Sequence, residues 1–404
     1  MRLSVLTQYF PPEIGAPQTR LSELAAHFVA AGHDVSVLTA MPSYPLGRVF
    51  DGYGGVVRLD RWQGIPVIRS FIVPSQSAAL VPRLANYLSF VASSAVTGSF
   101  ALPRSDFLMS ESPPLFLGIS GMYLARLKRA RLIFNVSDLW PDSAVRLGIV
   151  QAGSRAHRLA EALEARCYKA AWIVSGQSRS ILASIEQRFP GVRTYHLSNG
   201  CDTRRYGLDT VTREARRRID PGGKFVFLYA GLHGLAQGLD QILDTAERVK
   251  KDGRLHFVLI GDGPVKSRLV ERAKKARLEN VAFLDPVPSA ELPPILAASD
   301  ALLVTLGLDL PGAVPSKIYE SMASERPLIL VAAGEAAEIV RRHDAGIVVA
   351  PQHIDDLEAA VRNVADGGDA NRAMAARARA AAVEHFDRGK IAIRFMEFLQ
   401  GNLR

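Results

Sequence analysis

The stretch KFVFLYAGLHGLAQGLD (residues 224–240) indicates the fold class. Its apolar start passes into a loop that carries Gly231, Gly234 and Gly238, and a helical pattern follows. This order is typical of a βα unit whose loop N–H groups and helix N-terminus hold a diphosphate. The loop contains no Lys or Arg to neutralise such an anion. Glycines also suit tight strand-to-helix packing alone, so both interpretations stay open.

Apolar runs alternate with helical patterns along the rest of the chain, which predicts a parallel α/β architecture. A length of 404 residues favours two domains. Two Rossmann-like domains would face each other across a cleft at the carboxyl ends of their strands. In the first half we expect strands at 3–7, 35–39, 67–69, 107–110, 132–136 and 172–175, and helices at 18–31, 115–128 and 155–169. In the second half we expect strands at 225–229, 256–260, 281–283, 301–305, 328–331 and 347–349.

The charge balance differs between the two halves of the chain. Residues 1–200 carry 20 Lys and Arg against 12 Asp and Glu, whereas residues 201–404 carry 29 against 28. A basic half attracts phosphate-bearing substrates, anionic lipid or nucleic acid. No zinc-finger spacing or RNA-binding aromatic pattern occurs, so we expect no nucleic-acid partner. Two cysteines without metal-ligand spacing and a short, soon polar N-terminal run favour the cytoplasm.

The segment 70–103 is nearly free of charge, since Arg83 is its only charged residue. Within 84–103, Asn, Ser and Thr recur too often for a membrane span. A buried helix with its preceding loop is one interpretation. The other is a helix that lies on a lipid surface beside the basic half.

A second phosphate-binding candidate lies in VPSKIYESMASERPLIL (314–330), where a proline loop precedes a helix and a strand. Ser316 and Lys317 begin that helix, so free N–H groups and an ammonium can meet an anion there. Glu320 lies on the same helical face, and a carboxylate can accept hydrogen bonds from two sugar hydroxyls. We therefore predict that Lys317 binds a diphosphate and Glu320 a ribose. The alternative is a surface Lys–Glu pair.

The first turn of the chain, QYFPPEIGAPQTRLSELAAHF (8–28), is a third candidate. Gly15 falls at the carboxyl end of a predicted strand, where backbone can approach a ligand closely. Arg20 lies early on the following helix and can reach a phosphate. The alternative for Arg20 is a solvated helix arginine.

Seven fragments together resemble the retaining glycosyltransferases of family 4, which have the GT-B fold. The resemblance spans nearly the whole chain and is nearest to bacterial O-antigen and exopolysaccharide transferases, fucosamine-type enzymes included. The fragments are FPPEIGAPQTR (10–20), AAGHDVSVLTAMPSYPLG (30–47), SDLWPDSA (137–144), LSNGCDTRRY (197–206), YAGLHGLAQGLD (229–240), IGDGP (260–264) and PSKIYESMASERP (315–327).

The resemblance implies an acceptor-binding domain at 1–199 plus 387–404 and a nucleotide-sugar-binding domain at 200–386. It implies a UDP-sugar donor, no other cofactor and no metal. Catalytic roles are expected for Lys317 and Asp138, and acceptor contacts for Arg20, Tyr44 and Trp140. The donor-binding residues implied by the resemblance are Gly15, Gly231, Gln237, Val287, Ser316, Lys317 and Glu320.

The chain departs from the family pattern at several positions. Gly312 stands where the family has the first glutamate of Glu-x7-Glu, and Asp309 is the nearest substitute. The usual Arg and Lys of the glycine loop are replaced near Leu232 and Gln237, and Ser137 replaces the usual His before Asp138. Asp138 orients the acceptor or the donor sugar, or is a structural aspartate. Lys317 and Arg20 remain as the expected diphosphate charges.

We predict a retaining, metal-independent transferase, because no D-x-D pattern occurs in the chain. Front-face attack guided by the leaving phosphate is preferred, since no carboxylate is placed as a nucleophile. The expected acceptor is a polyprenyl-diphosphate-linked saccharide, at the cytoplasmic face of the inner membrane. Two alternatives are a nucleotide-sugar epimerase or phosphorylase, and a non-catalytic nucleotide-sugar-binding scaffold.

Overall fold

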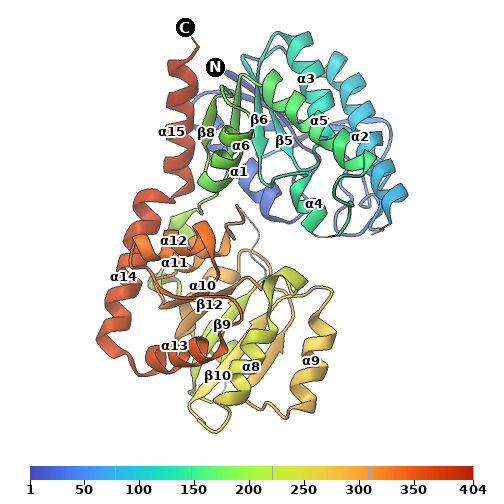
Figure 1. Cartoon of the computed structure of the whole chain (residues 1–404). Helices are drawn as coiled ribbons and strands as arrows, with labels where there is room; N and C mark the ends of the chain where they lie inside the picture. Colours follow the sequence, from blue (N-terminus) through green and yellow to red (C-terminus); the bar gives the residue numbers. More distant parts are fainter. Residues whose placement is uncertain (78, 147, 221, 308–311, 404) are drawn as a thin grey trace. The chain divides into compact units, whose positions relative to one another are not determined.

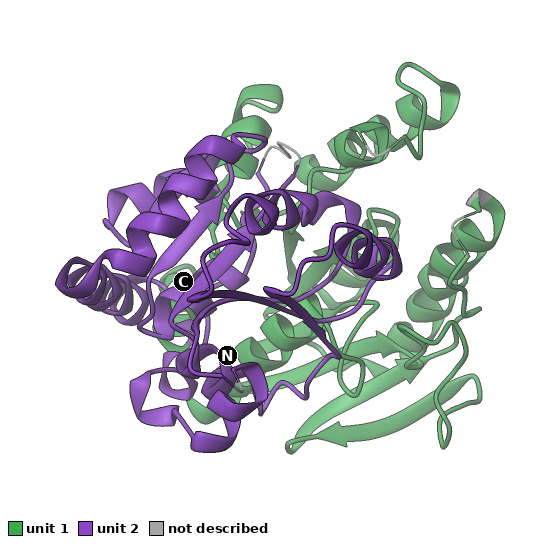
Figure 2. Cartoon of the chain, turned by 90° about the horizontal axis from the view of Figure 1, so that it is seen from below, with its two compact units in different colours: residues 1–199, 389–404 green, residues 200–388 purple. Residues whose placement is uncertain are grey.

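The computed structural model describes residues 1–403 except 78, 147, 221 and 308–311 (Figure 1). It divides into two compact units, Met1–Asn199 with Gly389–Arg404 and Gly200–Arg388 (Figure 2). The sequence predicts the same first boundary and places the second two residues earlier, after residue 386.

Unit 1 is built on one sheet in the order β3-β4-β2-β1-β5-β6-β7-β8. All neighbours are parallel except β3, which runs antiparallel to β4. The sequence missed β3, whose charged residues suit an exposed edge, and β8, which has three residues. The strands are β1 (Arg2–Leu6), β2 (Asp34–Ala40), β3 (Val57–Trp62), β4 (Ile65–Ser70), β5 (Phe107–Ser112), β6 (Arg131–Val136), β7 (Ile173–Gly176) and β8 (Thr194–His196).

Helices cover both faces of this sheet because alternate strand residues point to opposite sides. Val5 and Val37 pack against α1 and α15, whereas Leu6 and Leu38 pack against α2 and α3. The helices of unit 1 are α1 (Ala16–Ala30), α2 (Leu80–Ala101), α3 (Leu117–Lys128), α4 (Asp142–Arg146), α5 (Arg155–Ala170), α6 (Arg179–Arg188) and α15 (Arg388–Gly401), which begins one residue before the boundary.

Unit 2 holds a fully parallel sheet in the order β11-β10-β9-β12-β13-β14. The chain order therefore reverses between β9 and β12, which is the Rossmann arrangement. The strands are β9 (Phe225–Ala230), β10 (Leu255–Ile260), β11 (Val281–Leu284), β12 (Ala301–Thr305), β13 (Leu328–Val331) and β14 (Ile347–Val349). The helices are α7 (Arg213–Ile219), α8 (Asp240–Arg248), α9 (Lys266–Lys275), α10 (Leu292–Ala298), α11 (Lys317–Ala323), α12 (Gly334–Arg342), α13 (Ile354–Asp366) and α14 (Gly368–His385).

Several helices begin where a hydroxyl residue satisfies a free backbone N–H group. Ser154 caps α5, Ser178 caps α6 and Thr212 caps α7, each by accepting from the backbone N–H three residues later. These caps explain why the three helices begin directly after Ser154, Ser178 and Thr212.

Residues 80–101 of the nearly uncharged segment form the long helix α2, and both interpretations predict a helix there. Phe90 and Val91 are buried in the core beneath it, whereas Phe100 is 88% exposed. Phe90 and Val91 therefore face the core of unit 1, and Phe100 faces away from it. None of the helices among the described residues is long and apolar enough to cross a membrane.

Candidate functional site

The point where strand order reverses in unit 2 brings two distant segments together. β9 and β12 are neighbours, so the loop after β9, which is the first segment, lies beside the end of β12. Gly231 begins the first segment and Lys317 begins α11. A Cβ atom on Gly231 would overlap Cε and Nζ of Lys317, so the lysine side chain lies directly over this glycine. The loop glycine and the lysine predicted from separate fragments therefore form one site.

The Lys317 ammonium contacts an aromatic phenol. Its Nζ donates to the Tyr229 hydroxyl at 3.3 Å and lies 5.1 Å from the ring centroid. That hydroxyl donates to the Leu232 carbonyl at 2.8 Å, which leaves an oxygen lone pair for the lysine. Burial lowers the pKa of Lys317, and the nearby Glu320 carboxylate partly opposes this effect. Among the described residues Lys317 forms no ion pair, so its charge is available to an anion.

Glu320 follows Lys317 by one helical turn in the seven-residue α11. The two side chains help to line one small cavity together with Ala230 at the end of β9. Glu320 is half-buried, which argues against the alternative of a solvent-exposed Lys–Glu surface pair. Ser316 occupies the N-cap position, and its side chain makes no capping hydrogen bond.

Two further predicted donor residues, Gln237 and Val287, lie at other places in unit 2. The Gln237 carbonyl accepts from Thr305 Oγ1 at 2.7 Å, and its buried Oε1 has no hydrogen-bond partner among the described residues. Val287 follows β11, where it packs half-buried against the core. Gly312 has a φ of 80°, so a glutamate there would strain the backbone. Asp309 lies outside the described residues.

His233 is a residue of this loop that the sequence analysis missed. It is fully buried beside Tyr229, and neither ring nitrogen has a hydrogen-bond partner among the described residues. Burial lowers the pKa of His233 to about 4, with the Lys266 and Lys317 charges adding to the effect. The ring is therefore neutral near pH 7. A histidine between two loop glycines was the available sequence signal.

The corresponding point in unit 1 holds a buried ion pair instead of a lone cation. Arg20 is 7% exposed and donates through Nη2 to the Glu111 carboxylate. Its Nη1 donates to Asn199 at 3.3 Å and to Gln177 at 3.4 Å. The alternative of a solvated helix arginine is therefore wrong. The sequence analysis did not identify Glu111, which also accepts from Asn135 Nδ2 at 2.6 Å.

The loop after β1 is fixed by Glu13. Its Oε1 accepts from the backbone N–H groups of Ser43 and Tyr44, both at 2.8 Å. Burial raises the pKa of Glu13, and these hydrogen bonds partly oppose the shift. Tyr44 is 48% exposed, so its ring is available to a ligand. Gly15 has an extended backbone, and a Cβ there would meet only the Gln18 side chain.

Asp138 and Trp140 line a cavity of about 280 Å³ in unit 1, together with Tyr9, Arg83 and Tyr87. Burial raises the pKa of Asp138, and a hydrogen bond donated by the Ser143 hydroxyl opposes that shift. The Ser143 contact gives Asp138 a structural partner in α4. The aromatic walls offer stacking surface for a sugar ring.

The described residues contain no group of three or more His, Cys, Asp or Glu side chains that could hold a metal ion.

Comparisons with known proteins agree with this division of the chain. Residues 15–200 match the family "Glycosyl transferase 4-like domain", and residues 211–381 match "Glycosyl transferases group 1". WcaI of Escherichia coli (strain K12), named for colanic acid biosynthesis, is 27% identical over 90% of this chain and 91% of its own length. WbjE of Pseudomonas aeruginosa, named as a glycosyltransferase, is 28% identical over 59% of this chain and 60% of its own.

Solved structures show the same fold over the full length. Sucrose-phosphate synthase from Thermosynechococcus elongatus has a TM-score of 0.76 at 16% identity and covers 99% of this chain and 98% of its own. HepE of Anabaena, in complex with UDP and glucose, has a TM-score of 0.73 at 18% identity, with 99% and 100% coverage. The two-unit α/β architecture is thus the GT-B fold, and the chain belongs to the group 1 glycosyltransferases, with a glycosyltransferase 4-like first domain.

Proposed function

We propose that the protein is a retaining glycosyltransferase that moves a sugar from a UDP-sugar to a polyprenyl-diphosphate-linked saccharide. The single observation that carries the donor part is the Lys317 ammonium lying over Gly231, with Glu320 one turn later. A desolvated cation beside a backbone with no Cβ suits the diphosphate, and the carboxylate suits ribose hydroxyls. HepE, a structural neighbour, was solved with UDP-glucose, which supports UDP as the nucleotide.

The acceptor part has separate support. Tyr44, Trp140 and Asp138 lie in unit 1, where the first two offer aromatic surface and the third a carboxylate. The name of WcaI refers to colanic acid biosynthesis, and this favours a bacterial surface polysaccharide as the product. An N-acetylated amino sugar such as N-acetylfucosamine is the donor sugar that we propose. With such a lipid-linked acceptor the enzyme would act at the cytoplasmic face of the inner membrane.

In this mechanism the leaving diphosphate gains negative charge as the sugar–phosphate bond breaks. Lys317 Nζ stabilises that charge, and partial burial makes the interaction stronger than it would be in water. Tyr229 holds the ammonium in place through its hydroxyl. The leaving phosphate takes the proton of the acceptor hydroxyl, and front-face attack retains the anomeric configuration.

Replacing Lys317 by alanine tests this proposal. We expect turnover to fall about 100-fold or more, because a transition-state charge contact is lost. Lys275→Ala is the matched control, since that lysine is exposed and, among the described residues, pairs with Glu271 on α9 alone. Turnover is measured with a panel of UDP-sugars and a polyprenyl-diphosphate saccharide, and NMR identifies the anomer formed. A Lys317 variant within threefold of the parent, or an inverted product, would contradict the proposal.

A further inference from the structure

Helix α2 carries apolar side chains on the face that points away from the core. Val81, Leu88, Val96 and Phe100 are 75%, 45%, 62% and 88% exposed. Together with the exposed alanines at 85 and 92 they recur every three or four residues, so they form one stripe along the helix. At 1.5 Å per residue the stripe is about 30 Å long. The outer face of a surface helix is normally polar, so this pattern needs an explanation.

Helix α3 extends the apolar surface sideways. It packs against α2, and its Ile119, Tyr123 and Leu127 are 43%, 49% and 47% exposed. The Tyr123 hydroxyl lies 3.0 Å from Ser99 Oγ of α2, so the outer surfaces of the two helices are continuous. We call these seven exposed apolar residues of α2 and α3 the α2–α3 face.

The charges on the helices α2 and α3 all have one sign. Neither helix contains an acidic residue. Arg83 lies near one end of α2, Arg104 follows its other end, and Arg126, Lys128 and Arg129 lie at the end of α3. A cationic margin around apolar side chains is complementary to a surface that offers negative charge above an apolar interior.

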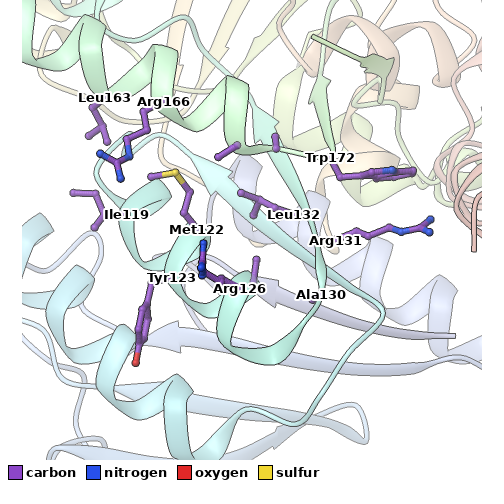
Figure 3. Close-up of a pocket in the computed structure, with 13 residues that line it drawn as sticks. Ile119, Met122, Tyr123, Arg126, Ala130, Arg131, Leu132, Leu163, Arg166 and Trp172 are labelled. Carbon is purple, nitrogen blue, oxygen red and sulfur yellow. The ribbon is translucent and has the colours of Figure 1, made fainter.

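A groove beside the α2–α3 face adds a place for a phosphate group. Figure 3 shows it between α3 and α5, with a volume of about 900 Å³. Ile119 and Tyr123 line it, and Arg126 and Arg166 come from the two helices that flank it. Neither arginine side chain makes a hydrogen bond or an ion pair with another described residue, so both can meet an anionic head group.

We propose that the α2–α3 face lies flat on an anionic phospholipid bilayer, with Arg126 and Arg166 at the lipid phosphates. Apolar side chains on such a face enter the boundary between head groups and acyl chains. A second copy of the chain fits less well. In a two-fold dimer the same patch would meet itself, and its cations would face like charges without any acid on α2 or α3 to offset them.

Vesicle flotation with the full chain tests the proposal without donor or acceptor, so the result does not depend on the proposed transferase activity. Vesicles of dioleoylphosphatidylcholine alone are compared with vesicles that contain about one third dioleoylphosphatidylglycerol. We expect flotation with the anionic vesicles at low salt and a partial loss at high salt, because salt screens the arginines and leaves the apolar part. A parent protein that does not float with anionic vesicles at low salt would overturn the proposal.

Two pairs of variants separate the apolar and charged contributions. Val96→Ser with Phe100→Ser removes apolar surface, and Leu59→Ser with Ile393→Ser is the control, because these two are 73% and 51% exposed elsewhere in unit 1. Arg126→Gln with Arg166→Gln is compared with Arg213→Gln and Arg217→Gln on α7. We expect each test pair to reduce partitioning about tenfold or more, and each control pair less than twofold.

Thermal unfolding by circular dichroism checks that each variant is folded. We expect all of them to fold, because the substituted positions are exposed. An equal loss of flotation in test and control pairs would overturn the proposal. Light scattering that shows a parent dimer, converted to a monomer by Val96→Ser with Phe100→Ser, would assign the α2–α3 face to self-association instead.

Discussion

Lys317 and Arg20 are the two cations that the sequence offers for a diphosphate, and their surroundings differ. Arg20 is buried and its charge is met by Glu111 within unit 1. A buried charge of this kind must be paired, and removal of either partner leaves the other uncompensated. Lys317 contacts the Tyr229 phenol and forms no ion pair among the described residues. Of the two, Lys317 is therefore the cation whose charge an incoming anion can neutralise.

Glu320 is the residue expected to bind ribose. Glu320→Ala should weaken UDP binding by about 1–3 kcal/mol, because hydrogen bonds to a charged group are lost. Isothermal titration calorimetry measures the affinity, with Glu338→Ala on α12 as the control for loss of an exposed carboxylate from unit 2. Equal UDP affinities of Glu320→Ala and the parent would remove this residue from the site.

At the scale of elements, the loop after β9 and the helix α11 depend on each other through Gly231. Gly231 has a φ of 150°, and a Cβ would overlap the Lys317 side chain. A glycine at position 231 therefore meets two requirements: it allows the positive φ, and it leaves space for the Lys317 side chain. Gly15, after β1, differs because its own surroundings do not demand a glycine.

Gly231→Ala should lower the stability of unit 2 by about 1–3 kcal/mol, since a side chain at positive φ is strained. The same change should weaken UDP binding, because Lys317 must move. Gly15→Ala should leave the melting temperature unchanged, since only the flexible Gln18 side chain has to shift. Circular dichroism melts and UDP calorimetry on both variants test this contrast. A Gly231→Ala variant with parental UDP affinity would show that the position of Lys317 does not matter.

At the scale of the whole molecule, the two units can be monitored separately. Trp62, Trp140 and Trp172 all lie in unit 1, so tryptophan fluorescence reports on that unit alone. Circular dichroism reports on both units. A pH effect that originates in unit 2 should therefore appear by circular dichroism and not by fluorescence.

His233 should produce such an effect. Its pKa of about 4 in the folded state lies below the unfolded value near 6.5, so the unfolded chain binds the proton first. Between these values the stability of unit 2 falls as pH is lowered, by up to roughly 3 kcal/mol. Urea unfolding at pH 7 and pH 5 measures the difference, and His233→Gln should reduce it. An unchanged difference in that variant would assign the acid sensitivity to other groups.

Metal independence is a further prediction for the complete enzyme. The chain has no D-x-D pattern, and Lys317 supplies a positive charge for the diphosphate. Transfer should persist in excess EDTA at a rate within about twofold of the untreated enzyme. Activity that is abolished by EDTA and restored by Mg²⁺ or Mn²⁺ would show that a metal site contributes to the reaction.

Most elements of the fold could be predicted because their patterns are local. Every strand predicted in 225–349 is present, since apolar runs between turn residues identify buried parallel strands. β3 could not be predicted because its charged residues lie on an exposed edge and its partner is supplied by β4. For the segment that forms α2 the sequence left a buried and a lipid-facing helix open, because sequence periodicity does not tell which side of a helix the core covers.

The sequence by itself determined the α/β class and the division near residue 200, and it predicted Lys317, Glu320 and Gly231 as donor-binding residues. Only the tertiary structure decided that Lys317 lies over Gly231, because β9 and β12 become neighbours where the strand order reverses. It also decided the different state of Arg20, whose partner Glu111 lies 91 residues away in the chain. Charge compensation depends on such long-range neighbours, and no local pattern of residues specifies them.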